Sequence, residues 1–137
     1  MKFNHIGLVV ANIVESARFY EEILGLHRKT EVIYDPIQKV KLLFLSDVTF
    51  PHIIYELIEP QDETSPSSQW LKKGNTMHHI CYEVDDIQGH IAQFVADGCL
   101  LIMGPVPAIA FNNREIAFVL TKEKLIIEFL ESENVAA

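Results

Sequence analysis

Two histidines and two glutamates stand at equivalent positions of an internal repeat. Asn4-His5-Ile6-Gly7 is echoed by His78-His79-Ile80-Cys81, an offset of 79 − 5 = 74 residues, and Tyr55-Glu56-Leu57 is echoed by Ile127-Glu128-Phe129. A duplicated unit of this length indicates one supersecondary module used twice, so that equivalent positions converge across a pseudo-twofold axis. The repeat predicts that four side chains lie together: His5, Glu56, His79 and Glu128.

These polar side chains fall on otherwise apolar faces of predicted strands. Because side chains alternate along a strand, Glu56 shares its face with Ile54 and Ile58, and Glu128 has the same kind of setting. A carboxylate on an apolar face costs free energy unless it is paired or bound to a cation. Imidazole nitrogens and carboxylate oxygens together suit one divalent ion of borderline character, which is Ni, Co, Mn, Fe or Zn.

An ion held in this way would support proton transfer next to a carbonyl group. A cation with open positions stabilises an enolate, and a positioned carboxylate base adds about 10²–10⁴-fold to the rate. The remaining histidines fit this site less well. His78 is expected to point to the opposite face from His79. His27, His52 and His90 have no partner in the repeat, so we expect these three at the surface.

Residues 2–59 form the first predicted module. A strand over residues 2–10 leads to a helix that Asn12 and Glu15 begin, in the pattern of a capping box, and that Gly25 ends. The apolar spacing predicts that the helix buries Ile13, Ala17, Tyr20 and Leu24. Three further strands are predicted over residues 28–34, 40–46 and 53–59.

Residues 77–131 repeat this order after a joint and a short helix over residues 60–76, where Ser65 is the expected N-cap. Asp86 begins the second helix, Gly98 ends it, and its buried residues are expected to be Ile87, Ile91, Phe94 and Val95. The strands are predicted over residues 77–84, 99–103, 116–121 and 125–131, with an irregular stretch over residues 104–114. The fold class is therefore α+β, with two βαβββ modules forming a cupped mixed sheet in a single domain, residues 1–137.

Composition excludes several classes of partner. With 137 residues, 49% of them hydrophobic, the chain can bury a proper core. Its net charge of −8 and lack of a basic run argue against a nucleic-acid partner. The sequence has no apolar run of about 18 residues, so no membrane span is predicted. Two cysteines without ligand spacing, and no signal-peptide pattern, favour the cytoplasm.

The motifs resemble the vicinal oxygen chelate superfamily, which includes glyoxalase I, methylmalonyl-CoA epimerase, extradiol dioxygenases and bleomycin-resistance proteins. The resemblance covers essentially the whole chain. It is carried by Asn4-His5-Ile6-Gly7, Glu56-Leu57-Ile58-Glu59-Pro60, Met77-His78-His79-Ile80 and Ile127-Glu128-Phe129, and by Trp70-Leu71-Lys72-Lys73-Gly74 after the joint. The branch that holds methylmalonyl-CoA epimerase and short bacterial glyoxalase I proteins is the most similar.

This resemblance implies a metal bound by His5, Glu56, His79 and Glu128, with Glu128 as the first candidate for the catalytic base and Glu56 as its counterpart. The ligand set favours glyoxalase I-like chemistry of the lactoylglutathione lyase type, on a hemithioacetal. The alternative is a methylmalonyl-CoA epimerase acting on a thioester. An epimerase of this family has an additional Glu where Ile37 stands here, and Asp35 is the carboxylate nearby.

Other roles follow from the same resemblance. Arg114, Lys72 and Lys73 flank the expected mouth of the site and could meet an anionic acyl substrate, although a solvated surface also explains them. A homodimer is the family expectation. An extradiol dioxygenase is disfavoured because Glu56 adds a fourth protein ligand, and a non-enzymatic binding protein of the bleomycin-resistance type is disfavoured because such proteins usually lack the ligands.

Overall fold

The computed structural model describes residues 1–133, and these divide into two compact units. The first unit is residues 5–78, and the second unit is residues 1–4 together with 79–133. Strands β1 (Lys2–Val9) and β6 (Met77–Val84) pass from one unit to the other. The boundaries fall immediately before His5 and His79, so the units begin at equivalent positions of the repeat. The single-domain organisation stays a prediction.

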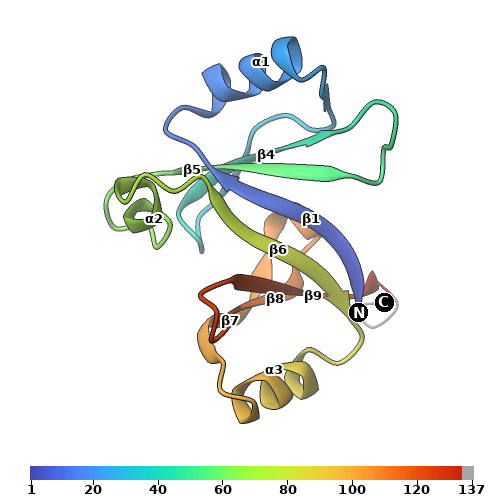
Figure 1. Cartoon of the computed structure of the whole chain (residues 1–137), viewed down its shortest axis with the longest axis vertical. Coiled ribbons are helices and arrows are strands. Elements are labelled where there is room, and N and C mark those ends of the chain that lie inside the picture. Colours follow the sequence, from blue (N-terminus) through green and yellow to red (C-terminus); the bar gives the residue numbers. More distant parts are fainter. Residues whose placement is uncertain (134–137) are drawn as a thin grey trace. The chain divides into compact units, whose positions relative to one another are not determined.

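The first unit places helix α1 (Ile13–Ile23) against strands in the order β2-β4-β5-β1 (Figure 1). Strand β1 runs parallel to β5, and the other neighbours are antiparallel. A short β3 also pairs with β4, and helix α2 (Ser68–Lys72) follows the last strand. The strand bounds are β2 (His27–Arg28), β3 (Ile33–Asp35), β4 (Val40–Ser46) and β5 (Ile54–Pro60).

The second unit repeats this arrangement. Its strands have the order β6-β9-β8-β7, with β6 parallel to β9 and the other neighbours antiparallel. The elements are α3 (Ile87–Ala96), β7 (Leu100–Ala108), a 3₁₀ turn (Ile109–Phe111), β8 (Arg114–Leu120) and β9 (Ile126–Glu131). The predicted α+β class, with one module used twice, is confirmed.

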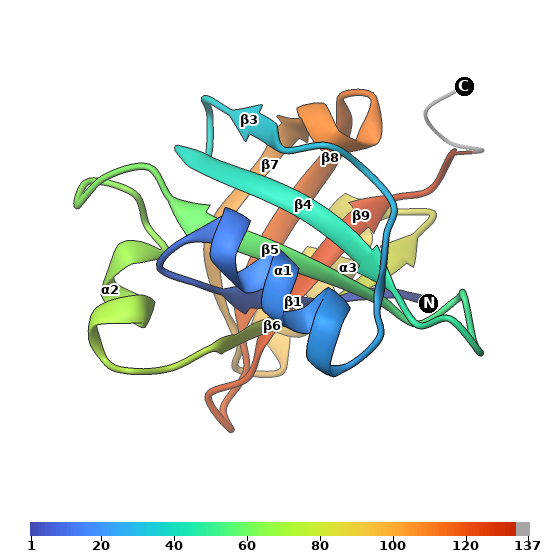
Figure 2. The ribbon, with the colours of Figure 1, turned by 90° about the horizontal axis from the view of Figure 1, so that it is seen from above.

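Each helix covers one face of its own strands with a separate apolar core. In the first unit, α1 lies against β4 and β5 (Figure 2). Its residues Ile13 and Ala17 pack with Leu43, Leu45 and Leu57. In the second unit, the corresponding core comprises Val84, Ile87, Ile91, Ala117, Val119, Ile127 and Phe129. Leu57 and Phe129 point into these cores. Because side chains alternate along a strand, their chain neighbours Glu56 and Glu128 point to the opposite face, away from the helices.

The predicted starts and stops of α1 and α3 are confirmed. Asn12 Oδ1 accepts a hydrogen bond from the Glu15 amide at 3.0 Å, and Asp86 Oδ1 accepts one from the Gly89 amide at 2.9 Å. Such N-caps are each worth about 1 kcal/mol. Gly25, just after the C-cap of α1, has the left-handed backbone (φ +68°) in which a helix commonly stops.

Two predicted core residues of the helices are exposed instead. Leu24 is 60% exposed because α1 ends at Ile23 and the chain turns there. Val95 is 46% exposed because its neighbour Phe94 already points into the core. Consecutive helical residues diverge by about 100°, so only one of such a pair faces the strands squarely.

Three further predictions were also wrong. The strand expected over residues 28–34 is split into β2 and β3, and β7 extends to Ala108 through the stretch expected to be irregular. Ser65 does not cap α2, because the N-cap of that helix is Ser67. The Ser65 hydroxyl instead donates to the Lys39 carbonyl at 2.5 Å and so holds the joint against the β3–β4 turn.

Among the described residues, no helix is long and apolar enough to span a membrane.

Candidate metal centre

The first unit brings His5 and Glu56 together in its interior. They lie on the parallel neighbours β1 and β5, whose register places Gly7 opposite Glu56, so that His5 stands two residues earlier on the same face. His5 Nε2 lies 3.4 Å from Glu56 Oε1, and both side chains are buried. A buried imidazole and a buried carboxylate thus converge from two adjacent strands.

The second unit repeats the pair with His79 and Glu128. Strands β6 and β9 are parallel, and their register places Cys81 opposite Glu128. His79 Nε2 lies 3.0 Å from Glu128 Oε1, and both side chains are again buried. The two pairs are therefore built by the same strands in the same register, one in each unit. We call them the first and second half-site.

An aromatic ring completes each half-site. Phe44 is paired in register with Glu56, and its ring meets the His5 imidazole edge-on, with centroids 5.8 Å apart. Phe118 is paired in register with Glu128 and meets His79 in the same way at 5.2 Å. Sequence reasoning missed these rings, although Phe44 and Phe118 show the same 74-residue offset as the histidines. The two rings place apolar surface beside each His–Glu pair.

The donor set of the half-sites fits a divalent cation. Bonds from zinc to imidazole nitrogen and to carboxylate oxygen are about 2.1 Å, so two neighbouring ligands of one ion lie about 3.0 to 3.4 Å apart. The separations of 3.4 Å in the first half-site and 3.0 Å in the second match this spacing. Each of the four buried residues offers one ligand atom. The ligand role of the four, and the catalytic roles of Glu56 and Glu128, stay predictions.

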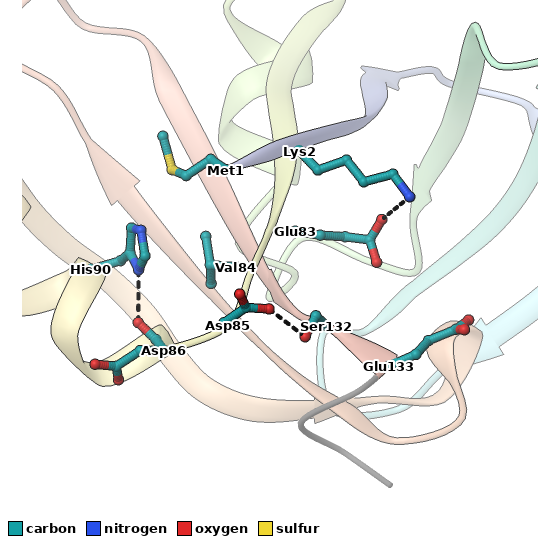
Figure 3. Close-up of a pocket in the computed structure, with 9 residues that line it drawn as sticks. All are labelled: Met1, Lys2, Glu83, Val84, Asp85, Asp86, His90, Ser132 and Glu133. Atoms are coloured by element: carbon teal, nitrogen blue, oxygen red, sulfur yellow. Dashed lines mark hydrogen bonds and ion pairs between the residues drawn. The ribbon is translucent and has the colours of Figure 1, made fainter.

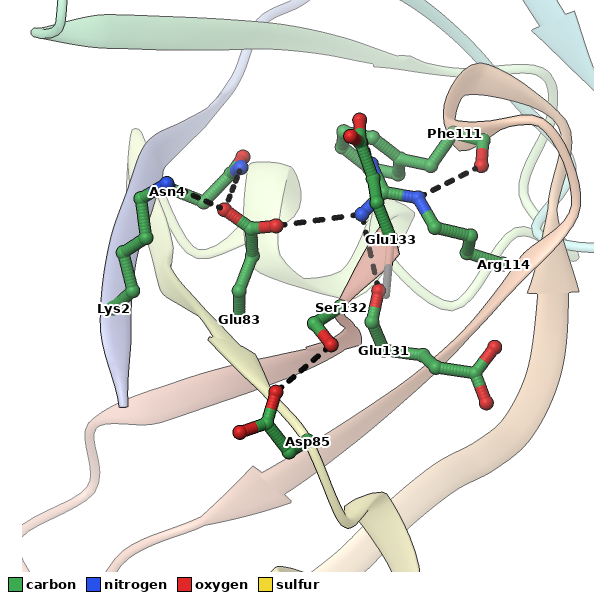
Figure 4. Close-up of polar contacts among 9 residues, drawn as sticks. All are labelled: Lys2, Asn4, Glu83, Asp85, Phe111, Arg114, Glu131, Ser132 and Glu133. Carbon is green, nitrogen blue, oxygen red and sulfur yellow. Dashed lines mark hydrogen bonds and ion pairs between the residues drawn. The ribbon is translucent and has the colours of Figure 1, made fainter. Parts of the chain in front are cut away.

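Arg114 is tied to protein acceptors in the second unit (Figure 4). Its Nη1 donates to Glu83 Oε1 at 3.4 Å and to the Glu131 carbonyl at 3.1 Å, and its Nε donates to the Phe111 carbonyl at 3.2 Å. The guanidinium therefore joins the ends of β6, β8 and β9. Lys73 is exposed at the C-cap of α2. A substrate-binding role for Arg114 or Lys73 stays a prediction.

The remaining histidines lie in other settings. His78 meets the Trp70 ring edge-on at 5.5 Å, which agrees with its expected orientation away from the half-site. His90 is half-buried on α3, where its ring lies 5.9 Å from the ring of Phe129, and its Nδ1 lies 2.8 Å from the Asp86 carbonyl oxygen. His27 and His52 are exposed. Neither half-site includes any of these imidazoles.

Asp35, the carboxylate nearest to Ile37, is a buried turn residue. Its Oδ1 accepts hydrogen bonds from the amides of Ile37 and Gln38, at 3.0 Å and 3.1 Å, and its Oδ2 accepts one from the Gln38 side chain at 2.8 Å. These bonds hold the turn between β3 and β4. Because both oxygens already accept bonds within the turn, the structure gives Asp35 a structural role.

A cavity of about 590 Å³ opens elsewhere on the second unit (Figure 3). It is rich in carboxylates and includes one lysine and one histidine: Lys2, Glu83, Asp85, Asp86, His90 and Glu133. Asp85 accepts a hydrogen bond from the Ser132 hydroxyl at 2.9 Å, and Lys2 lies 4.0 Å from Glu83. None of the four candidate ligands lines this cavity, so it is distinct from the half-sites.

Two epimerases align with most of the length of this chain. The mitochondrial methylmalonyl-CoA epimerase of Dictyostelium discoideum is 28% identical, over 88% of this chain and 71% of its own. The ethylmalonyl-CoA/methylmalonyl-CoA epimerase of Cereibacter sphaeroides is 27% identical, over 89% of this chain and 90% of its own.

Solved structures have the same fold. A variant of the Streptomyces coelicolor methylmalonyl-CoA epimerase, in complex with 2-nitronate-propionyl-CoA, superposes with a TM-score of 0.79 at 23% identity, covering 98% of this chain and 96% of that chain. The family model for the Glyoxalase/Bleomycin resistance protein/Dioxygenase superfamily matches residues 4–118. The chain therefore belongs to the glyoxalase/bleomycin resistance protein/dioxygenase superfamily.

Proposed function

We propose that this chain is a divalent-metal-dependent isomerase that removes and returns a proton at the carbon next to a thioester carbonyl, in the manner of a methylmalonyl-CoA epimerase. The observation that carries the proposal is the pair of matching His–Glu half-sites, in a chain whose relatives include epimerases. The sequence alone favoured glyoxalase I-like chemistry, and these relatives favour the alternative that it left open.

The proposal joins the two half-sites around one ion. His5, Glu56, His79 and Glu128 would be its ligands, and the bound cation would stabilise the negative charge of an enolate oxygen. The chain's own residues supply the rest. Phe44 and Phe118 would exclude water from the two His–Glu pairs. The lower local dielectric constant would then strengthen the interactions between charges there.

Glu128 and Glu56 are assigned as the groups that move the proton. One carboxylate takes the proton from the α-carbon, leaving the enolate, and a proton then returns to the same carbon. Inversion requires that it return to the opposite face. Because Glu56 and Glu128 come from the two modules of the repeat, they are the carboxylates that we assign to opposite faces. Asp35 is excluded from this role by its three hydrogen bonds within the turn.

Methylmalonyl-CoA of one configuration, incubated with the metal-loaded protein in deuterated water, tests the proposal. Formation of the other epimer together with deuterium at the α-carbon is the expected result. Deuterium exchange with retention would show that a single base acts on one face. Neither exchange nor epimerisation, with the metal bound, would overturn the proposal.

Glyoxalase I-like isomerisation is the second candidate function. Two observations favour it: the donor set of two imidazoles and two carboxylates, and the 51% exposed Ile37 where an epimerase of this family has an additional glutamate. Isomerisation of a hemithioacetal can proceed on one face with one base. Turnover of methylglyoxal with a thiol, by protein that is inactive on methylmalonyl-CoA, would select this candidate.

A further inference from the structure

Each histidine of the half-sites directly follows residues that belong to the other unit. The first unit begins at His5, whereas residues 1–4, which lead into it along β1, belong to the second unit. The second unit resumes at His79, whereas His78, just before it in β6, belongs to the first unit. Consecutive Cα atoms lie about 3.8 Å apart. A contact that holds Asn4 or His78 therefore also constrains the histidine that follows.

In the second unit, Asn4 is held by a carboxylate (Figure 4). Asn4 Nδ2 donates a hydrogen bond to Glu83 Oε2 at 3.4 Å, and Lys2 Nζ lies 4.0 Å from the same oxygen. Arg114 Nη1 donates to the other oxygen, Oε1, at 3.4 Å and so orients the carboxylate. The side chains of Glu83 and Arg114 are only 17% and 11% exposed, so water screens this pair little. We call Glu83 and Arg114 the ionic anchor of β1.

In the first unit, the start of β6 is held by an indole. Trp70 Nε1 donates a hydrogen bond to the Met77 carbonyl at 2.6 Å, and the Trp70 ring meets the His78 imidazole edge-on, with centroids 5.5 Å apart. One residue earlier, the Thr76 carbonyl accepts a hydrogen bond from the Val9 amide at 2.8 Å. We call Trp70 the aromatic anchor of β6. It contacts the two residues that immediately precede the histidine of the second half-site.

The repeat shows that the fold does not require an ion pair at the ionic anchor. The 74-residue offset of the histidines makes Val9 equivalent to Glu83 and Val40 equivalent to Arg114. Both valines are buried, with exposed fractions of 1% and 4%. Two apolar side chains thus fill, in the first unit, the positions of a carboxylate and a guanidinium in the second. Because desolvating two charges costs free energy that valines avoid, packing alone does not explain the ion pair.

We propose that Glu83 and Arg114 together, and Trp70 separately, are positioning residues for the metal centre. They fix the main chain directly before His5 and His79 and so hold the two imidazoles for one shared ion. Each anchor acts on the histidine of the other unit, which gives the two half-sites a fixed relation that neither unit has by itself. This positioning role rests on the proposed function, because the shared ion is part of that proposal.

Amide hydrogen exchange of the metal-free full chain tests the anchors directly. Glu83→Val/Arg114→Val gives the second unit the residues of the first unit and leaves no buried charge unpaired. Residues 3–6 should then exchange about 10-fold faster, because a hydrogen bond to a charged group contributes at least that factor to an equilibrium. Residues 77–80 should not change. Trp70→Leu should produce the opposite pattern, with faster exchange at residues 77–80 alone.

A matched control removes another ion pair from the same protein. Glu21→Val/Arg28→Val breaks a 2.9 Å pair between α1 and β2, and neither residue lies on β1 or β6. Exchange of both segments should stay at the wild-type rate. Glu83→Gln keeps an oxygen that accepts the hydrogen bond, and Trp70→Phe keeps an aromatic ring, so these variants should fall between the wild type and the full replacements. Melting temperatures show that every variant is folded.

Titration with Co²⁺, followed by the visible absorption of the bound ion, tests the consequence for the metal. The Kd should rise about 10- to 100-fold in Glu83→Val/Arg114→Val and in Trp70→Leu, as it does when a group that orients a metal ligand is lost. The absorption spectrum of the bound ion should change as well, because a displaced imidazole alters the coordination geometry. The Glu21→Val/Arg28→Val control should keep the wild-type Kd and spectrum.

The two measurements distinguish failure of the positioning role from failure of the metal site. Exchange that stays unchanged before His5 and His79 in the anchor variants overturns the positioning role. Faster exchange with an unchanged Kd for Co²⁺ also overturns it, while the metal site of the proposed function stands. A wild type that binds no Co²⁺ overturns the proposed function, and the positioning role with it, whatever the exchange shows.

Discussion

At the scale of single residues, the half-sites combine groups that differ sharply in the cost of burial. A buried carboxylate without a compensating charge is expensive, and Glu56 and Glu128 are buried beside apolar neighbours such as Phe44 and Phe118. The imidazoles at 3.4 Å and 3.0 Å offset part of this cost. A shared cation would offset the rest, which is why the pairs are a candidate for metal binding and not only a structural contact.

Replacing Glu128 by Gln removes the proton acceptor and keeps the shape of the side chain. We expect kcat on methylmalonyl-CoA to fall by about 10²–10⁴-fold, because a general base contributes that much. Kinetics and circular dichroism check the rate and the fold. Glu123→Gln, at an exposed turn, is the control and should keep wild-type activity. A Glu128→Gln enzyme with unchanged kcat would remove Glu128 as the base.

Replacing Ile37 by Glu places a carboxylate where the resemblance to the epimerases predicts one. Ile37 is 51% exposed on the β3–β4 turn, so we expect a stability change within about 0.5 kcal/mol. Epimerase activity should rise if the residue reaches the substrate. Ile53→Glu, on another partly exposed apolar residue of the same unit, serves as the control. Equal activity of the two variants would contradict the assignment of Ile37 to that position.

At the scale of secondary-structure elements, the fold depends on a few local conformations that the strands alone would not adopt. Gly104 is the sharpest example. Its φ is +93°, and a Cβ at this position would lie 2.5 Å from the Ile116 carbonyl oxygen and 2.9 Å from Ala117 Cα. Strand β7 passes this close to β8 at the irregular register between Met103 and Val106. Glycine is therefore required by both backbone conformation and space.

Replacing Gly104 by Ala should lower the free energy of unfolding by about 3 kcal/mol or more, since backbone atoms cannot move aside as a flexible side chain can. Gly25→Ala is the matched control: its φ is +68°, but no atom lies within 4 Å of the added Cβ. It should cost about 1–2 kcal/mol. Urea denaturation measures both. Equal losses would mean that φ alone, and not the close approach, decides the cost.

The elements also show what sequence can and cannot predict. Caps are local chemistry, so Asn12, Asp86 and Gly25 marked the helix ends correctly. The matching positions of the half-sites followed from the repeat, because equal sequence at equal spacing produced equal register. The burial of Leu24 and Val95 was predicted wrongly, since spacing does not reveal where a helix turns away from its strands. The extension of β7 through Pro105 and Pro107 could not be predicted from local sequence, because it depends on pairing with β8, which lies later in the chain.

At the scale of the whole molecule, the central question is whether the half-sites act as one. Each unit contributes one imidazole and one carboxylate, which is too few ligands to hold an ion firmly in isolation. One shared ion and two weakly bound ions predict different stoichiometries, so metal content distinguishes them without an activity assay.

We expect one divalent ion per chain in the purified protein, and none after His79→Ala, because the loss of one ligand from a shared site weakens all of it. Metal analysis by mass spectrometry measures the stoichiometry. Two ions in the wild type and one in the variant would indicate separate sites. Removal of the ion by a chelator should also lower the melting temperature, since a ligand at 100 times its Kd stabilises the folded state by about 2.7 kcal/mol.

The matching registers of the two units have a consequence for how such a protein could arise. Because His5, Glu56 and Phe44 recur as His79, Glu128 and Phe118, a polypeptide half as long would carry one histidine, one glutamate and one phenylalanine in the required places. Two molecules of that shorter polypeptide would supply all four donors to an ion. Fusion of their genes then frees each copy to change on its own.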